Sequence, residues 1–484
     1  MTRHRIFTAD KLREECGVFG IHGNDDAAAH TVLGLHALQH RGQEAAGIVS
    51  FDGRLFHSHR ALGLVGDHFS NEAVIGALPG HAAIGHVRYS TSGAPLLRNV
   101  QPLYADFAFG GLALGHNGNL TNALALRRQL VEEGCLFQST SDTEVIIHLI
   151  ARSRQPTVVE RLVDALRQVE GAFALVALSA EALYGVRDPL GIRPLVLGDL
   201  DGAPILASET CALDIMGARF VRDIEPGEVV SATMSGIESF KPFVMPPRRF
   251  CIFEYVYFAR PDSAVEGQNV YEVRKRIGAE LAREAPAPAD IVVPVPDSGV
   301  PSAIGYAQAA DLPFELGLIR NHYVGRTFIE PSDRIRHLGV RLKHNANRST
   351  VAGKRVVLVD DSIVRGTTST KIVAMIRNAG AAEVHMRVAS PPTIHSCFYG
   401  VDTPERSELL AAQNNLEAMA RIIGVDSLDF LSLDGLYRAV SSARRDAVQP
   451  QFCDACFSGD YPTLLEDCGR GGSADQLSLM LEEH

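Results

Sequence analysis

Hydrophobic and polar positions divide the chain into two parts of different character. Between residues 16 and 245, apolar runs of strand length alternate with turn residues, as at 83–87, 112–114, 174–178 and 194–197. Apolar residues recur with helical spacing at 142–150 and 158–169. This pattern predicts an α+β fold or a layered αββα arrangement whose sheets are mostly antiparallel.

The part after residue 250 has longer apolar runs. Those at 291–295 and 356–359 end in small or acidic residues, and helical patterns follow them. Strands that are apolar on both faces and alternate with helices are typical of a parallel sheet covered on both sides. We therefore expect a second, α/β domain with a central parallel sheet.

A segment rich in proline and basic residues, KPFVMPPRR at 241–249, separates the two parts. Proline ends helices and strands, so the domain boundary should fall there. We expect one domain at 16–245 and another at 246–440, with residues 1–15 outside the first. The remaining residues, 441–484, carry a C-x-x-C motif and then a polar tail that should be mobile.

Composition narrows the class of protein. With 46% hydrophobic and 21% charged residues, the 484-residue chain has the balance of a globular protein of two or three domains. Its net charge of −11 disfavours nucleic-acid binding, which needs clustered lysine and arginine. No apolar run reaches the roughly 18 residues of a membrane helix, and residues 1–15 lack the apolar core of a secretory signal. We expect a cytoplasmic protein.

The segment VVLVDDSIVRGTTST at 356–370 is the most informative stretch of the second part. A buried strand ends in Asp360 and Asp361, a loop of small residues follows, and a helix should begin near Ser369. Backbone N–H groups, hydroxyls and a helix N-terminus form a cradle for a phosphate. The two carboxylates suit ribose hydroxyls or a magnesium ion.

This segment resembles the signature of the type I phosphoribosyltransferases. The resemblance implies that IVVPVPDSG at 291–299 is the loop that faces the diphosphate and its Mg²⁺. It assigns the magnesium ion to Ser298, Asp360 and Asp361. It assigns phosphoribosyl pyrophosphate to Asp297, Ser298, Arg326, Lys343, Asp360, Asp361, Arg365, Gly366, Thr367 and Thr368.

Residues 320–345 between these two loops are polar and basic. They could form a solvated connector. The resemblance instead implies a flexible lid whose cations neutralise the diphosphate and exclude water when it closes. The run PSDRIR departs from the family's pattern, so we assign only Arg326 and Lys343 to the ligand.

A cysteine and a series of polar motifs mark the first part. Cys16 lies in ECGVFGI and is followed by HRGQEAAGI at 40–48, GHVRYST at 85–91, HNGNL at 116–120, SDTE at 141–144 and RDPLGIRPL at 187–195. A lone cysteine is usually a small core residue. In this order, however, the motifs resemble the class II glutamine amidotransferases, which are N-terminal-nucleophile enzymes.

The resemblance gives these residues roles. Residues 1–15 would be a propeptide, and their removal would give Cys16 a free α-amine that serves as its own base, because such an amine has a pKa near 8. Asn117 and Gly118 would stabilise the oxyanion. Arg88 would bind the α-carboxylate of glutamine, and Asp142 would bind its α-ammonium group.

Four other cysteines lie in or near the second part. Cys453 and Cys456 form the C-x-x-C motif, Cys251 opens CIFEYVYFARPDS, and Cys397 lies in PPTIHSCFYG. A C-x-x-C motif alone fits a redox pair, a zinc site or chance. The three contexts together resemble the subgroup of amidophosphoribosyltransferases in which four cysteines hold one [4Fe-4S] cluster. Zinc, or no metal, stays the alternative, and Cys135, Cys211 and Cys468 should be packing or surface thiols.

The resemblance to this family covers residues 16–462. It implies a four-layer αββα domain followed by a type I phosphoribosyltransferase domain. It also implies transfer of ammonia from glutamine to phosphoribosyl pyrophosphate, as the first step of purine synthesis, with Mg²⁺ and one [4Fe-4S] cluster. Inhibition by AMP and GMP and a homotetramer are implied as well. The alternatives are another class II amidotransferase, or a regulator with a phosphoribosyltransferase fold and no catalysis.

Overall fold

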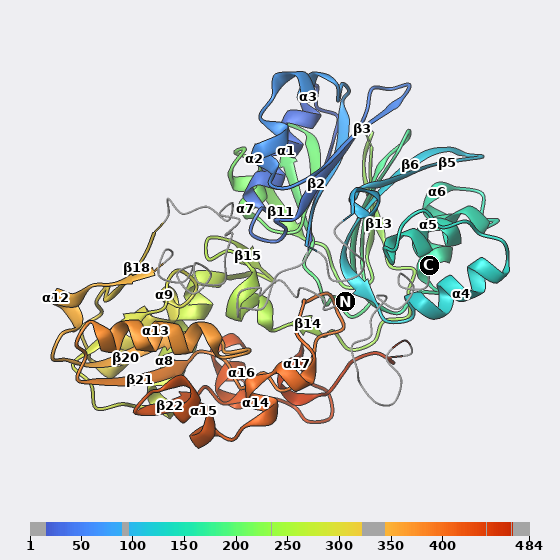
Figure 1. Ribbon diagram of the computed structural model, residues 1–484. Coiled ribbons are helices and arrows are strands. Elements are labelled where there is room, and N and C mark those ends of the chain that lie inside the picture. Colours follow the sequence, from blue (N-terminus) through green and yellow to red (C-terminus); the bar gives the residue numbers. More distant parts are fainter. Residues whose placement is uncertain are drawn as a thin grey trace, which may run out of the picture.

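The computed structural model describes residues 16–89, 96–233, 235–321, 344–441, 443–465 and 467. Two lobes are visible in Figure 1. In the first, two antiparallel sheets face each other and helices cover their outer sides. In the second, helices lie on both sides of a parallel sheet. The structure thus confirms the fold class that the sequence predicts for each part.

The first sheet has seven strands in the order β11-β9-β10-β1-β4-β2-β3. Their bounds are β1 Gly17–His22, β2 Ala45–Phe51, β3 Phe56–Leu62, β4 Ala82–Arg88, β9 Val196–Leu200, β10 Ala203–Ala207 and β11 Arg219–Asp223. The helices on its outer side are α1 Ala27–Ala37, α2 Val65–Phe69, α3 Glu72–Gly76 and α7 Cys211–Asp214.

The second sheet has six strands in the order β13-β12-β8-β7-β6-β5. Their bounds are β5 Leu103–Phe107, β6 Gly110–Leu120, β7 Gly171–Ser179, β8 Leu183–Arg187, β12 Val229–Thr233 and β13 Gly236–Phe240. The short helix η1, Leu97–Asn99, precedes β5. The outer side carries α4 Ala123–Glu132, α5 Thr143–Arg152 and α6 Val158–Leu166.

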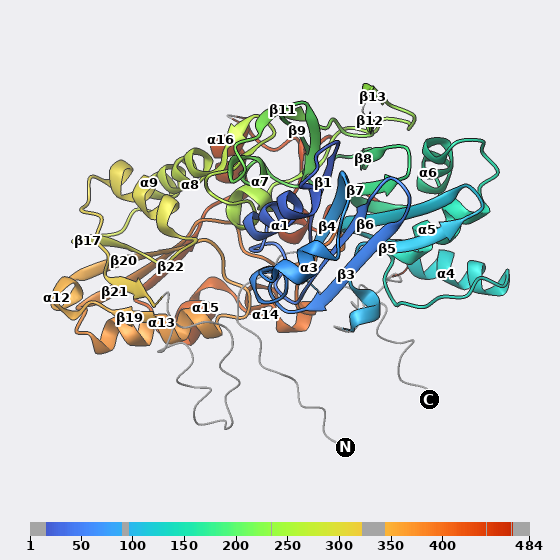
Figure 2. The ribbon, with the colours of Figure 1, turned by 90° about the horizontal axis from the view of Figure 1, so that it is seen from above.

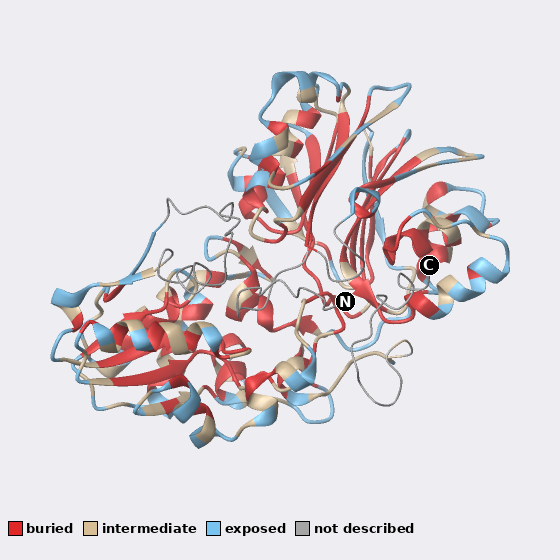
Figure 3. Cartoon of the chain, viewed as in Figure 1, coloured by how far each residue is buried: buried red, intermediate tan, exposed pale blue. Residues whose placement is uncertain are grey.

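Strand β1 is buried at every position, because its side chains point alternately to two faces of the sheet that are both covered. Phe19 and Ile21 pack with the α1 side of the first sheet. Val18, on the opposite face, packs between the two sheets. Because successive side chains of a strand point to opposite faces, a strand of an inner layer has to be apolar throughout. Figure 3 shows the resulting buried layers, with exposed residues on the outer faces of the helices.

The sheet of the second lobe is parallel, in the order β17-β20-β21-β22. Its strands are β17 Ile291–Pro294, β20 Arg355–Asp360, β21 Glu383–Val388 and β22 Ser427–Phe430. Figure 2 shows α8 and α9 on one side of this sheet and α13 and α15 on the other. The helices are α8 Val270–Glu284, α9 Val300–Ala310, α13 Thr367–Asn378, α15 Leu416–Ile423 and α16 Leu433–Ser441.

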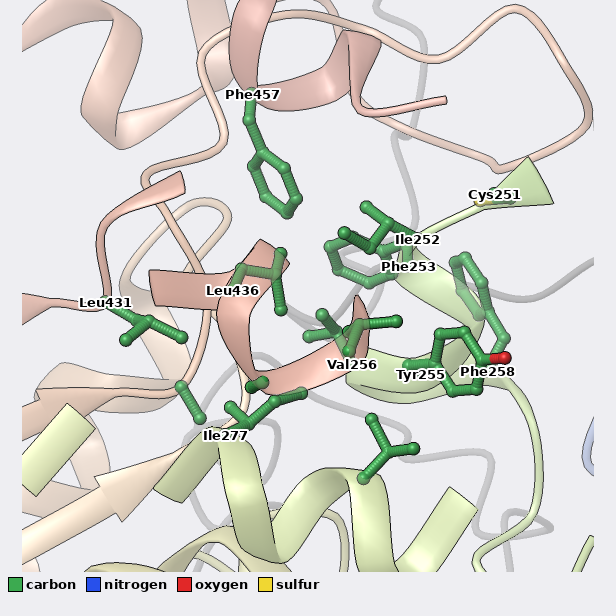
Figure 4. Packing of buried hydrophobic residues seen from close by; sticks show 14 of the residues in the cluster. Cys251, Ile252, Phe253, Tyr255, Val256, Phe258, Ile277, Leu431, Leu436 and Phe457 are labelled. Carbon is green, nitrogen blue, oxygen red and sulfur yellow. The ribbon is translucent and has the colours of Figure 1, made fainter. Parts of the chain in front are cut away.

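Short elements join the two lobes. Strand β14 (Phe250–Cys251) pairs in parallel with β23 (Phe452–Cys453), which lies about 200 residues later in the chain. The π-helix η2 (Glu254–Phe258) follows β14, and Figure 4 shows its Val256 close to Leu436 and Ile277. The cluster of buried residues around η2 also contains Leu190 and Ile192 of the first lobe. One hydrophobic core therefore crosses the boundary.

The remaining elements are short. They are β15 Ala264–Val265, β16 Gln268–Asn269, β18 Leu318–Arg320, β19 His344–Ala346, α12 Arg348–Val351, η3 Arg406–Glu408, α14 Leu410–Gln413 and α17 Ala455–Ser458. Among the described residues, no helix has the length and apolar character needed to cross a membrane.

Two of the boundaries that differ from the prediction have a clear local cause. The strand expected from residue 194 begins at Val196, because Pro194 has no N–H to donate to the sheet. The helix expected near Ser369 begins at Thr367. Gly366 has a φ of 79°, and this left-handed residue turns the chain into the helix earlier than the sequence pattern suggests.

Candidate active sites

Cys16 lies directly before β1, at the end where β1 pairs with β4. Its side chain is buried, and the thiol is 3.8 Å from the carbonyl oxygen of Tyr89. In the register of the sheet, Gly17 lies opposite Val87. The thiol is thereby placed beside Arg88, the last residue of β4.

The Arg88 guanidinium is the positive centre of this site. Its burial lowers the pKa of the group, whereas Cys16, Glu44 and Asp142 act to raise it. These three groups therefore surround Arg88 closely enough to interact with its charge. A buried guanidinium next to the candidate nucleophile can bind a carboxylate with two parallel hydrogen bonds.

Asn117 and Gly118 come from β6, in the facing sheet. The Asn117 amide nitrogen is 3.5 Å from the Ser208 hydroxyl, and the amide oxygen is buried with no hydrogen-bond partner in the described part of the chain. Gly118 has a φ of 143°, and a Cβ there would lie 2.0 Å from the Ala172 carbonyl oxygen. Only glycine fits this backbone, whose N–H is the second candidate oxyanion donor.

Asp142 lies just before α5 and is held on two sides. Its Oδ2 accepts a hydrogen bond from the Leu120 N–H at 3.1 Å and is 3.7 Å from the Nδ1 of His116. These contacts fix the carboxylate against the end of β6, next to the candidate oxyanion donors. The other oxygen, Oδ1, lies 3.5 Å from the hydroxyls of Ser141 and Thr143, and the carboxylate acts on the charge of Arg88.

Sequence reasoning missed two residues that hold this site. The Ser208 hydroxyl accepts a hydrogen bond from the Val18 N–H at 3.0 Å and so joins Asn117 to β1. His86 contacts the carbonyl oxygen of His116, one residue before Asn117, at 3.0 Å. Burial lowers the pKa of His86 to about 3, so the ring is neutral at working pH. His86 stands in the GHVRYST motif, whereas Ser208 has no local signal.

In the second lobe, Asp360 ends β20 and Asp361 follows it. Both carboxylates are buried. Asp360 Oδ1 accepts the N–H of Asp361 at 3.0 Å, and Asp361 accepts hydroxyl hydrogen bonds from Ser362 and Ser298. The bond from Ser298 joins the two predicted loops at one edge of the sheet. All the donor atoms of this pocket that the sequence assigns to Mg²⁺ are oxygens, the ligand type this ion prefers.

The start of α13 has the local geometry expected of an anion cradle. Gly366 turns the chain, and Thr367 and Thr368 form the first turn of the helix, where backbone N–H groups point outward. A Cβ at Gly366 would lie 2.6 Å from Leu410 Cδ2. The Arg365 guanidinium binds Glu408 at 2.7 and 2.9 Å, so this predicted ligand group is paired with a carboxylate of the protein.

Asp297 forms an ion pair with Arg320, at the start of the segment expected to be a lid. The other two predicted lid groups, Arg326 and Lys343, lie outside the described residues, as do residues 1–15, predicted to be a propeptide, and Cys468. The structure thus brings Asp297, Ser298 and the Asp360–Asp361 pair to one edge of the sheet.

The four cysteines assigned to a cluster come from three separate segments. Cys251 and Cys453 lie opposite each other in the β14–β23 pair. Burial raises the pKa of Cys251 to about 11. It also raises the pKa of the Cys453 and Cys456 thiols well above the usual value, and Cys251 and Cys397 raise both further. Within the described ranges, however, no three His, Cys, Asp or Glu side chains are arranged to hold a metal ion.

Models of two protein-domain families match this chain, one in each lobe. A model of the glutamine amidotransferase domain matches residues 86–214, and one of the phosphoribosyl transferase domain matches residues 263–390. Fold and sites thus define a glutamine amidotransferase joined to a phosphoribosyltransferase.

Relatives identify the family. The chain is 59% identical to the amidophosphoribosyltransferase of Rhizobium etli, over 97% of this chain and 96% of that protein. It is 48% identical to the Bacillus subtilis protein of the same name, over 94% and 95%. A solved structure of the B. subtilis glutamine phosphoribosylpyrophosphate amidotransferase, complexed with ADP and GMP, has a TM-score of 0.88 at 47% identity. It covers 93% of this chain and 98% of that one.

The chain belongs to the amidophosphoribosyltransferase family. It is a glutamine-dependent transferase that carries out the first step of purine biosynthesis. This finding confirms the function expected from the sequence. It excludes the two alternatives, which were a different class II amidotransferase and a regulator without catalysis.

Proposed function

We propose that Cys16 releases ammonia from glutamine and that the pocket around Asp360 and Asp361 transfers it to phosphoribosyl pyrophosphate. The observation that carries the first half is the gathering of the buried Cys16 and Asp142 around the Arg88 guanidinium, on whose charge both act. A thiol beside one cation and one anion matches a substrate that carries an α-carboxylate and an α-ammonium group. A Cys16→Ala variant that loses glutamine use but keeps ammonia use is the test.

In the glutamine site, removal of residues 1–15 would leave the α-amine of Cys16 free. This amine takes the thiol proton, and the thiolate attacks the carboxamide carbon of glutamine. The Asn117 side chain and the Gly118 N–H stabilise the tetrahedral oxyanion, and the protonated amine gives its proton to the leaving ammonia. Water then releases glutamate from the thioester and restores the thiol.

In the second site, Asp297, Ser298, Arg326 and Lys343 would bind the diphosphate, and Asp360 and Asp361 the ribose hydroxyls. The N-terminal turn of α13, from Arg365 to Thr368, would bind the 5′-phosphate. Mg²⁺ held at Ser298, Asp360 and Asp361 would neutralise charge on the leaving diphosphate. Ammonia attacks the anomeric carbon as the bond to diphosphate breaks, which gives 5-phosphoribosylamine.

Ammonia must travel between the two sites without entering solvent, and the apolar core shared by the lobes supports an internal route. Nucleotides such as AMP and GMP share the ribose-phosphate group of the substrate. We therefore expect them to inhibit, as products of the pathway that this enzyme begins. We also propose that the protein is a homotetramer. We place it in the cytoplasm, because a reducing compartment keeps the buried thiols reduced.

We also propose one [4Fe-4S] cluster on Cys251, Cys397, Cys453 and Cys456. The closeness of these thiols supports this set, because Cys251 and Cys397 add to the burial that raises the pKa of Cys453 and Cys456, and a bound cation would offset that charge. A single zinc ion on the same four sulfurs is the alternative, because thiolates also suit tetrahedral zinc. A cluster is wider, and its role would be to tie β14 and β23 together.

Anaerobic purification should give a brown protein with about four irons per chain. A Cys251→Ser variant should lose most of this iron, whereas the matched Cys135→Ser change, at a partly buried cysteine of the first lobe, should keep it. Iron and zinc are measured by elemental analysis of the same samples. Stoichiometric zinc, or a metal-free protein with full activity, would contradict the cluster.

A further inference from the structure

Two arginines and two glutamates form a buried network between the lobes. Arg41 follows α1, Arg193 precedes β9, and Glu209 follows β10, all in the first lobe. Glu254 is the first residue of η2 and belongs to the second lobe. The side chains of both glutamates are 0% exposed and those of both arginines 1%. The glutamine site and the transfer site do not use these four residues directly.

Glu254 joins the two arginines. Its Oε2 accepts a hydrogen bond from Arg41 Nη2 at 2.6 Å, and its Oε1 accepts bonds from Arg41 Nη1 at 3.3 Å and Arg193 Nη1 at 3.1 Å. Arg41 Nε donates to Glu209. Burial would raise the pKa of Glu209, but the charges of Arg41 and His40 outweigh it and hold this pKa well below the usual value. Glu209 is therefore ionised.

Arg41 lies against the backbone that carries the nucleophile. A Cβ at Gly17 would be 3.5 Å from the Arg41 Cβ, so nothing separates this residue from the strand that begins after Cys16. The next residue, Gly42, is as close to β4, because a Cβ there would be 2.6 Å from the Arg88 nitrogen. The Glu44 N–H then donates to the Arg88 carbonyl oxygen at 3.1 Å.

The segment from Arg41 to Glu44 thus packs against Gly17, the residue after Cys16, and against Arg88. It supports the point where the pairing of β1 with β4 places the thiol beside the group assigned to the α-carboxylate of glutamine. The guanidinium of Arg41 is anchored on one side by Glu209 of its own lobe. On the other side it is anchored by Glu254 of the second lobe.

Arg193 connects Glu254 to another part of the second lobe, the chain around Tyr399. The Arg193 Nε donates to the Tyr399 carbonyl oxygen at 2.9 Å, and the Tyr399 N–H is 3.4 Å from the sulfur of Cys397. Tyr399 lies in the connection that follows β21, the strand next to β20 and its two aspartates. A shift in this connection would therefore reach Arg41 through two ion pairs.

We infer that Glu254, a residue of the second lobe, is a positioning residue of the glutamine site. It holds the Arg41 guanidinium and so fixes the segment that packs against the start of β1 and the end of β4, next to Cys16 and Arg88. This inference rests on the proposed role of Cys16. A network kept only for stability is the competing explanation, since replacement of a buried ion pair by apolar residues often costs little.

The test is Glu254→Gln, which keeps the size of the side chain and removes its charge. Glutaminase activity is measured with and without phosphoribosyl pyrophosphate, and synthesis is measured with ammonium in place of glutamine. We expect kcat/KM for glutamine to fall by about 10- to 100-fold, because misplacement by about 1 Å costs up to 100-fold. Adding phosphoribosyl pyrophosphate should not restore the glutaminase activity, and ammonium-dependent synthesis should stay within about 2-fold.

Glu272→Gln is the matched control, since Glu272 lies in the same lobe in a largely exposed pair with Lys275. If Glu254→Gln does not fold, the same assays are run on the double variant Glu254→Gln/Arg193→Gln. This variant removes one buried charge of each sign and so leaves fewer unpaired charges. Equal loss of ammonium- and glutamine-dependent synthesis, or unchanged glutamine kinetics, would overturn the positioning role. Retained glutamine use in Cys16→Ala would instead overturn the proposed function beneath it.

Discussion

Cys16→Ala is expected to reduce glutamine-dependent synthesis by at least about 1000-fold, because removal of the nucleophile of a covalent mechanism costs this much or more. Synthesis from ammonium should remain within about 2-fold of the unchanged enzyme. The physical reason is the separation of the two chemistries. Cys16 lies at the start of β1 in the first lobe, whereas the transfer pocket lies at the edge of the parallel sheet in the second.

The measurement is the initial rate of diphosphate release with glutamine or with ammonium chloride. Cys135→Ala serves as the control, because this partly buried thiol packs beside the outer core of the first lobe. Cys135→Ala should use both nitrogen sources normally. If Cys16→Ala still used glutamine, another nucleophile would have to be sought. If it lost ammonium use as well, the two sites would not be separable.

The double variant Asp360→Asn/Asp361→Asn is expected to lose synthesis from both nitrogen sources by at least about 100-fold. The two carboxylates are buried, and they are joined to the opposite loop through Ser298. Asparagine keeps their size but removes the charge that would hold Mg²⁺ and accept the ribose hydroxyls. Slow glutamine hydrolysis without phosphoribosyl pyrophosphate should continue, since the Cys16 site is unchanged.

Asp290→Asn is a suitable comparison for this variant. Asp290 directly precedes β17 and forms a half-exposed ion pair with Arg355, so its loss should be nearly neutral. Magnesium dependence of the residual rate gives an independent reading. Normal synthesis at an ordinary magnesium concentration by the double variant would contradict the assignment of the pocket.

Local sequence was sufficient for the features that depend on neighbouring residues. The run VVLV followed by two aspartates gave both the strand β20 and the acidic pocket, because the same few residues determine both. Alternating short strands gave the layered first lobe. The exact ends of elements depend on single residues. The start of α13 depends on the left-handed conformation of Gly366, and the start of β9 depends on Pro194.

Contacts between distant residues could not be predicted. Glu254 lies 213 residues after Arg41, and neither carries a local pattern that names the other. Ser208 likewise meets Val18 across 190 residues. Such pairs depend on the order of strands in the sheets and on the packing of the lobes. No short segment of a single sequence contains this information.

The proposed mechanism depends most on a thiol that becomes active when the residues before it are removed. Intact-mass spectrometry of the purified chain, with glutaminase activity measured on the same sample, tests this point directly. We predict that the active species begins at Cys16 and that chain retaining residues 1–15 hydrolyses no glutamine. Full activity in a species that still carries those residues would contradict the mechanism, because the α-amine of Cys16 would then be part of a peptide bond.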